Sequence, residues 1–190
     1  ENLQVIKNQI KQIGNLVNEF SDFARMPKPI LKDNDIVLIF KDNIKLLGNI
    51  DETISIDLKY NSGKIIFNSD QEQLSRVFFN LIKNSIESIQ QKSEDNKDFK
   101  KIVSIEINKL DNQINIVIID NGIGFGIFAD NIKDIINPYF TTKKNGTGLG
   151  LSIVSKIIND HNGKIEFIPI ENGAKVSINF KLDGIRNINS

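Results

Sequence analysis

Six short segments with strand character, separated by longer helical patterns, most constrain how this chain can fold. Residues 54–60 alternate apolar and polar side chains, which is the period of a β-strand with one buried face. Turn sequences join the strands into pairs, at Asn61-Ser62-Gly63, Asp111-Asn112 and Asn172-Gly173. The other expected strands are residues 64–67, 103–109, 114–119, 164–169 and 174–182. Antiparallel pairs with helices between them predict an α+β fold, a two-layer sandwich with the helices on one face of the sheet.

Three helices are expected between these strands, and the first two have polar residues able to cap their first turns. Their expected limits are Asp33 or Asn34 as the cap of the first, Ser69 or Asp70 to about Gln91 for the second, and residues 148–160 for the third. Residues 93–101 are polar and charged and are expected to form a loop.

An apolar stripe with heptad spacing runs along residues 1–25. Its members are Leu3, Ile6, Ile10, Ile13, Val17 and Phe20. Alternating steps of three and four place them on one side of a helix, either as a seam to another helix or as the inner face of a helix packed on its own domain. Met26-Pro27-Lys28-Pro29 then ends the helix, because proline cannot continue one. The expected organisation is a helix at 1–25, a linker at 26–33, one domain at 34–183 and a tail at 184–190.

The composition argues against several classes of function. Lys+Arg and Asp+Glu both number 24, so the formal net charge is zero, which argues against nucleic acid as the main partner. The chain contains no cysteine, which excludes disulfides and thiolate chemistry. No apolar run reaches the roughly 18 residues needed to cross a bilayer, and no signal peptide is visible.

Asn80, Asn84 and Glu87 share one face of the second expected helix, because they are spaced i, i+4, i+7. An asparagine amide oxygen can bind Mg²⁺ without adding charge, which suits a metal already held by phosphates. The alternative is a solvated polar stripe on an amphipathic helix.

Asp120, Gly122 and Gly124 directly follow the apolar strand 114–119. A carboxylate at the end of a buried strand is costly without a partner, and it can accept a hydrogen bond from an adenine amino group. The two glycines allow the backbone to approach a flat ring closely. The alternative is a plain Asp-Asn-Gly turn.

A third motif opens the last expected helix and consists of Gly146, Thr147, Gly148, Leu149 and Gly150. The free N–H groups and dipole of a helix N-terminus favour an anion. The motif is not a P-loop, because no Gly-Lys-Ser/Thr follows, and no strand precedes it as in a dinucleotide fingerprint. The alternative is a flexible loop with a helix cap. Upstream, Phe140 and Lys143 can form a hydrophobic latch with a cationic end.

The order and spacing of these motifs resemble the N, G1, F and G2 boxes of the histidine kinase ATP-binding domain, which shares the Bergerat fold of the gyrase and MutL ATPases. The matching segments are Asn80/Asn84, Asp120–Gly124, Tyr139–Lys143 and Gly146–Gly150. The resemblance covers about residues 34–182. It implies a sandwich of a mixed sheet and three helices, with ATP between the helices and a mobile lid at about 125–147.

The resemblance also implies a role for each motif. Asp120 would bind adenine, with Gly122 and Gly124 beside it. Asn80 and Asn84 would act in catalysis, and Asn84 would hold Mg²⁺. Lys143 would be a cation of the lid. The phosphates of ATP would lie against Gly146, Thr147, Gly148, Leu149 and Gly150.

Residues 1–25 look like the second helix of the dimerisation hairpin in these kinases, and Asn18–Pro29 is similar to the junction that follows it in NtrY-type nitrogen-regulation sensors. This implies a protein-histidine kinase that passes the γ-phosphoryl group of ATP to a hairpin histidine and then to a response regulator. It further implies a homodimer through the hairpin helices and a cytoplasmic domain, with the inner membrane reached only through segments outside this chain. The single histidine, His161, lies at a turn and is expected to be structural.

Two other functions stay open from the sequence. Gyrase-type ATPases carry a water-activating glutamate where this chain has Asn80; an amide cannot take that proton, which favours phosphotransfer. A degenerate kinase that only binds nucleotide is the third possibility.

Glu87 stands where some kinases of this family have Lys or Arg, so no cation from that face is expected on the phosphates; Lys83 is a possible substitute.

Overall fold

The computed structural model describes most of the chain beyond the first helix. Described are residues 3, 6–7, 10, 13–14, 17, 20–21, 24–96, 98–125, 132–141, 143 and 146–182. Its elements, in order, are β1 (Lys32–Asp35), α2 (Ile36–Leu47), β2 (Ser55–Tyr60), β3 (Ile66–Ser69), α3 (Gln71–Asp95), β4 (Ile102–Leu110), β5 (Gln113–Asp120), α4 (Gly150–Asp160), β6 (Gly163–Ile170) and β7 (Gly173–Lys181).

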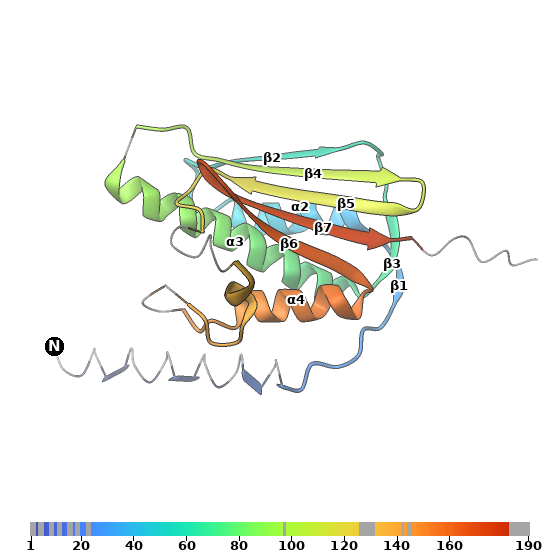
Figure 1. Cartoon of the computed structure of the whole chain (residues 1–190), viewed down its shortest axis with the longest axis horizontal. Helices are drawn as coiled ribbons and strands as arrows, with labels where there is room; N and C mark the ends of the chain where they lie inside the picture. Colours follow the sequence, from blue (N-terminus) through green and yellow to red (C-terminus); the bar gives the residue numbers. More distant parts are fainter. Residues whose placement is uncertain are drawn as a thin grey trace, which may run out of the picture.

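Five of the strands form one mixed sheet in the order β2-β4-β5-β7-β6. β2 pairs parallel with β4, and the other three pairings are antiparallel. α3 packs against both α2 and α4, and in Figure 1 α3 and α4 lie below the strands while α2 lies behind them. The predicted two-layer sandwich with helices on one face is therefore confirmed, but the expectation of antiparallel pairs alone is wrong for β2.

The core fills the space between the sheet and the helices, and its pattern follows from the two secondary-structure periods. Along β5 every second residue is buried, beginning with Ile114, Ile116 and Ile118. From α3, the buried side chains include Leu74 and Phe78, at the four-residue spacing of one helical face. The alternation along β5 continues to Asp120, so its carboxylate points into the same layer as the isoleucines.

The expected hairpin of residues 54–60 with 64–67 is wrong. β3 pairs with β1 in a separate two-stranded sheet, while β2 joins the edge of the main sheet. Asn61 explains the separation, because its side chain exchanges two hydrogen bonds with the backbone of Lys109, at 3.0 and 2.9 Å. The turn after β2 is thus bound to β4, and the chain leaves the sheet there.

The cap of α2 is Asp35, and neither Asp33 nor Asn34 as expected. The Asp35 carboxylate accepts the backbone N–H of Val37 at 3.1 Å, whereas the two earlier residues are part of β1. β1 also begins at Lys32, inside the stretch expected to be a linker.

α3 begins after the expected cap Asp70, whose carboxylate accepts the N–H of Gln73 at 3.1 Å. It ends at Asp95, four residues beyond the expected Gln91, so the first part of the expected 93–101 loop is helical. The turns at Asp111-Asn112 and before Gly173 join β4 to β5 and β6 to β7 as expected.

His161 is structural, as expected. It is buried directly after α4. Its Nε2 accepts the backbone N–H of Asp70 at 3.0 Å, so the ring proton is on Nδ1, which lies 2.8 Å from the carbonyl oxygen of Ile157. The ring therefore joins the end of α4 to the start of α3.

The described residues between positions 3 and 24 are helical, and the apolar members of the heptad stripe are exposed. Phe20 stacks on Tyr139 with ring centroids 6.5 Å apart. The following segment is held on α3, since Ile30 donates its N–H to Asp70 and Gln73 donates its side-chain amide to the carbonyl of Pro27. No helix within the described ranges is long and apolar enough to span a membrane. The expected tail at 184–190 lies outside the described residues.

Candidate functional site

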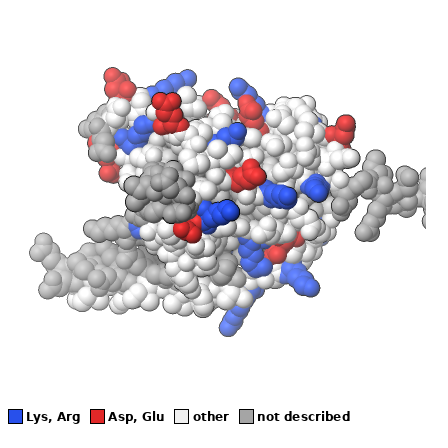
Figure 2. Space-filling view, viewed as in Figure 1, with Lys and Arg blue, Asp and Glu red and all other residues white. Residues whose placement is uncertain are grey.

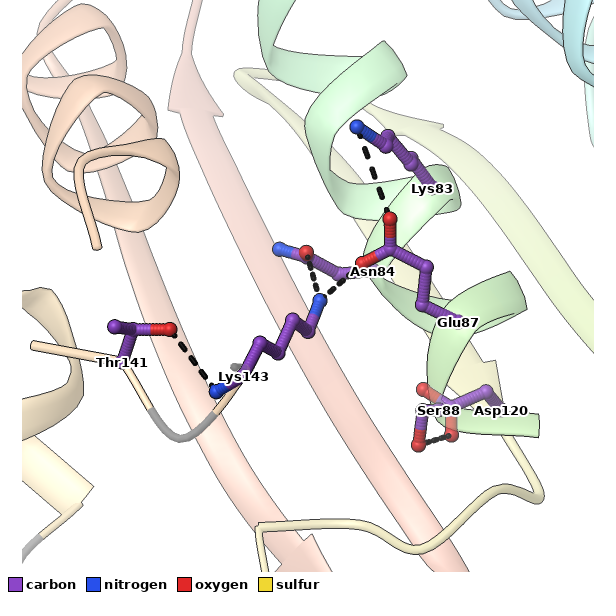
Figure 3. Close-up of polar contacts among 7 residues, drawn as sticks. All are labelled: Lys83, Asn84, Glu87, Ser88, Asp120, Thr141 and Lys143. Carbon is purple, nitrogen blue, oxygen red and sulfur yellow. Dashed lines mark hydrogen bonds and ion pairs between the residues drawn. The ribbon is translucent and has the colours of Figure 1, made fainter. Parts of the chain in front are cut away.

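Asp120 ends β5 and is only 6% exposed. Its Oδ1 accepts the backbone N–H of Gly122 at 3.0 Å and the hydroxyl of Ser88 at 3.4 Å (Figure 3). Burial raises the pKa of the Asp120 carboxyl, and the donors around it, which include Ser85, offset this only in part. These donors are neutral, and a neutral donor stabilises a buried carboxylate less than a charged donor does.

The turn after Asp120 lies directly on α3. A side chain at Gly122 would bring a Cβ within 2.2 Å of the hydroxyl oxygen of Ser88 and 2.7 Å of the backbone nitrogen of Ile89. Gly124 has a φ of +68° and lies against the carbonyl of Gly173. The neighbours that require these glycines are atoms of the chain itself, so close backbone packing accounts for them without a ligand.

Asn80, Asn84 and Ser88 follow one another at four-residue intervals along one side of α3, as the helical period predicts. Eight residues of α-helix span about 12 Å. Asn80 is held by a hydrogen bond from its amide nitrogen to the carbonyl of Arg76, at 2.9 Å. Its Oδ1 faces the start of α4, 3.6 Å from where a Cβ on Gly150 would stand. This side of α3 therefore runs from the first residue of α4 to Asp120.

Lys143 reaches α3 from the segment that precedes α4. Its ammonium donates to Oδ1 of Asn84 at 2.9 Å and forms an ion pair with Glu87 (Figure 3). Glu87 also lies 3.7 Å from the ammonium of Lys83, one turn earlier on the helix. The expected lid cation and the expected metal-binding asparagine are thus in direct contact.

α4 begins at Gly150, later than the expected residue 148, and its cap residue Leu149 makes no side-chain capping hydrogen bond. Gly148 has a φ of +71°, and its carbonyl accepts the N–H of Tyr139 at 3.0 Å. Leu149 is buried, so it can offer a ligand its backbone only. The hydroxyl oxygen of Thr147 accepts a hydrogen bond from the backbone N–H of Leu149 at 3.4 Å.

Parts of the expected lid at 125–147 lie outside the described residues, namely 126–131, 142 and 144–145. Residues 132–136 form a short 3₁₀ turn, in which the side chain of Ile135 is buried. Gly146 is close to the side chain of Thr141, and its N–H bonds to the carbonyl of Lys143 at 3.1 Å.

Two residues of this region were missed from the sequence. Ser88 contacts Asp120, and its place one turn after Asn84 was the signal that could have found it. Asn121 binds the start of β4, since its side chain accepts the N–H of Ile102 at 3.0 Å and donates to the carbonyl of Lys100 at 2.6 Å. No local sequence pattern marks a turn residue such as Asn121 that also binds a neighbouring strand.

The buried charge of Asp120 predicts a stability effect of Asp120→Asn in the ligand-free chain. The raised pKa means that the folded chain binds a proton that the unfolded chain releases, so stability falls as pH rises from the unfolded to the folded pKa. The amide keeps an acceptor for Gly122 without the charge. We expect the variant to raise the free energy of unfolding at pH 7 by about 0.5–2 kcal/mol, measured by urea titration, and to lose this pH dependence.

The control for this measurement is Asp42→Asn, which removes an exposed carboxylate from α2 and should change the unfolding free energy very little. A large loss of stability in Asp120→Asn would contradict the expectation and make Asp120 a structural anchor.

The chain resembles known proteins over most of its length. The family described as histidine kinase-, DNA gyrase B-, and HSP90-like ATPases matches residues 69–184. Nitrogen regulation protein NtrY of Azorhizobium caulinodans is 32% identical, over 94% of this chain and 23% of its own length. A putative NtrY-like sensor histidine kinase of Rickettsia bellii is 29% identical, over 97% of this chain and 29% of its own. The chain thus spans less than a third of either relative.

Solved structures share the fold. The catalytic domain of histidine kinase ThkA, in a nucleotide-free form, superposes with a TM-score of 0.68 at 22% identity, covering 80% of this chain and 97% of that one. The predicted mixed sheet with three helices is therefore confirmed. Since the family match covers more than half of the residues, the chain belongs to the histidine kinase-, DNA gyrase B-, and HSP90-like ATPase family.

Proposed function

We propose that this chain is the ATP-binding catalytic part of a sensor histidine kinase, which transfers the γ-phosphoryl group of ATP to a histidine on a dimerisation hairpin. The observation that carries the proposal is the buried carboxylate of Asp120, surrounded by neutral donors, at one end of a polar side of α3. The N-terminus of α4 lies at the other end. The family match and the named sensor kinases among the relatives support the same assignment.

Asp120 binds the adenine of the nucleotide. Its carboxylate can accept the exocyclic amino N–H, and a charge-assisted hydrogen bond of this kind compensates a buried carboxylate that neutral donors compensate only partly. Gly122 and Gly124 act by holding the turn on α3 and on Gly173, which keeps the carboxylate in place.

The phosphates lie along α3 toward the start of α4. The backbone N–H groups of Gly146, Thr147, Gly148, Leu149 and Gly150 are the candidate donors, together with the helix dipole. Lys143 adds a positive charge from the lid side. The roughly 12 Å between Asn80 and Ser88 along the helix accommodates an extended nucleoside polyphosphate between these groups and Asp120.

Asn84 is the proposed protein ligand of Mg²⁺, with Asn80 beside it. The donor chemistry fits, because Oδ1 of Asn84 already accepts a cationic donor, the Lys143 ammonium, at 2.9 Å. The described residues contain no cluster of three His, Cys, Asp or Glu side chains, so such a metal would take most of its ligands from phosphates and water. Bound there, Mg²⁺ would neutralise phosphate charge.

Asn80 favours phosphotransfer over hydrolysis. Its amide nitrogen is occupied by the carbonyl of Arg76 and its Oδ1 faces Gly150, and an amide has no basic site for a proton from water. A gyrase-type ATPase therefore lacks its general base here. A kinase that only binds nucleotide remains the second candidate, since it requires the same adenine and phosphate contacts.

For the whole protein, the proposal includes a homodimer through the hairpin helices, a response regulator as partner and a cytoplasmic location of this domain, with the inner membrane reached only through other segments. The exposed apolar residues at Leu3, Ile10 and Val17 support the dimer. A structural neighbour, histidine kinase ThkA, was solved in complex with response regulator TrrA; it has a TM-score of 0.72 at 18% identity. On the face in Figure 2, basic and acidic residues are interspersed, which does not favour nucleic acid.

The adenine assignment predicts that Asp120→Asn weakens ADP binding. The amide keeps an acceptor but loses the charge, and a hydrogen bond to a charged group contributes about 1.5–3 kcal/mol, so we expect an affinity loss of roughly 10–100-fold. Isothermal titration calorimetry with ADP and Mg²⁺ measures this, with Asp42→Asn as the control. Unchanged affinity would remove Asp120 from the adenine site.

The role of Asn80 predicts very slow ATP hydrolysis by this chain, because general-base catalysis contributes about 10²–10⁴-fold and no base faces the phosphates from this position. With γ-labelled ATP, His161 should stay unlabelled, since both of its ring nitrogens are engaged in the interior. In a longer protein that includes the hairpin histidine, the label should pass to that imidazole. Rapid hydrolysis without any phosphohistidine would instead support an ATPase.

A further inference from the structure

Lys143 connects the segment before α4 to α3, which lies far away in the sequence. Its ammonium contacts Asn84 and Glu87, which lie 59 and 56 residues earlier (Figure 3). Its backbone is also held, since its N–H donates to the hydroxyl of Thr141 at 3.1 Å and its carbonyl accepts from Gly146 at 3.1 Å. A local turn thus presents one positive charge to the polar side of α3.

The ammonium lies on the atom that the proposed function assigns to a metal. Oδ1 of Asn84 is the oxygen that would bind Mg²⁺, and it is 2.9 Å from Nζ of Lys143. A divalent cation and an ammonium on the same amide oxygen repel each other strongly at such distances. Lys143 must therefore leave Asn84 before this oxygen can bind a metal.

Glu87 has a second positively charged neighbour, so it would still have a partner if Lys143 moved away. The ammonium of Lys83 lies 3.7 Å from its other carboxylate oxygen, on the same helix. The side chains of Lys143 and Glu87 are 42% and 34% exposed, so their ion pair is screened by water. Exposed pairs of this kind contribute little, about 0–1 kcal/mol, so the cost of breaking this one is small.

We propose that Glu87 and Lys143 form a displaceable clamp, in which the Lys143 ammonium occupies the metal position at Asn84 in the nucleotide-free chain and moves to the phosphates when nucleotide binds. The inference rests on the proposed function and makes Glu87 a positioning residue. In the free chain Glu87 and Asn84 hold the Lys143 ammonium on α3, so the clamp opposes binding until phosphates offer the lysine a stronger anionic partner.

The test is a double-mutant cycle on ADP affinity in EDTA, measured by isothermal titration calorimetry with the whole chain. Glu87→Gln opens the clamp, and we expect it to tighten ADP binding about two- to fivefold while Lys143 is present. In the Lys143→Met background the same substitution should change the affinity by less than about 1.5-fold, because no clamp remains. Lys143→Met alone should weaken binding, by roughly fivefold or more.

The matched control is Asp160→Asn. Asp160 forms an i,i+4 ion pair with Lys156 on α4, at 2.8 Å, as Glu87 does with Lys83 on α3. The substitution therefore removes one negative charge from a similar pair that does not involve Lys143. Its ADP affinity should equal that of the native chain. Thermal unfolding of all variants checks that they are folded.

Three outcomes would overturn the clamp. Glu87→Gln that leaves ADP affinity unchanged or weakens it would show that Glu87 does not restrain Lys143. Equal tightening in both backgrounds would reduce the effect to the loss of a repulsive charge. If the native chain binds no ADP with or without Mg²⁺, the proposed function fails together with the clamp. If it binds ADP but the double-mutant cycle shows no coupling between Glu87 and Lys143, only the clamp is overturned.

Discussion

The packing of α3 against β5 is the contact on which the rest of the proposed site depends. The apolar side of α3 is fixed in the core by residues such as Leu74 and Phe78, so its polar side is presented in a defined position. The absence of a side chain at Gly122 lets the turn after β5 lie on Ser88. Asp120 then takes the place of the next isoleucine in the inward-facing series of β5. A stabilising apolar position is thus given to a charged group, which is typical of sites shaped for a ligand.

Those parts of the fold that depend on local pattern could be predicted from the sequence. The β4–β5 and β6–β7 turns are short and carry turn residues, and α3 has a strong apolar face with a capping aspartate. The pairing of β3 could not be predicted in this way. Its partner β1, Lys32–Asp35, is entirely polar and has no alternating pattern, and the pairing joins segments separated by a whole helix and strand.

The candidate site shows the same division between local and distant information. Asn80, Asn84 and Asp120 could be singled out because helical spacing and strand alternation already fix which way they face. The contact of Lys143 with Glu87 joins residues 56 positions apart and depends on the course of the segment between them. The glycines were expected to approach a ligand, whereas Gly122 is required by a neighbouring helix. A glycine that the sequence marks as a ligand contact can therefore also be required by the packing of the chain itself.

The most direct test of nucleotide binding between α3, β5 and α4 is an NMR titration of the ¹⁵N-labelled chain with Mg·ADP. Binding at the proposed site predicts saturable shifts of the backbone amides of Gly122, Gly124 and Gly148–Gly150, with the amides of Lys32–Asp35 in β1 unchanged. Shifts confined to other parts of the chain, or none at millimolar ADP, would contradict the account.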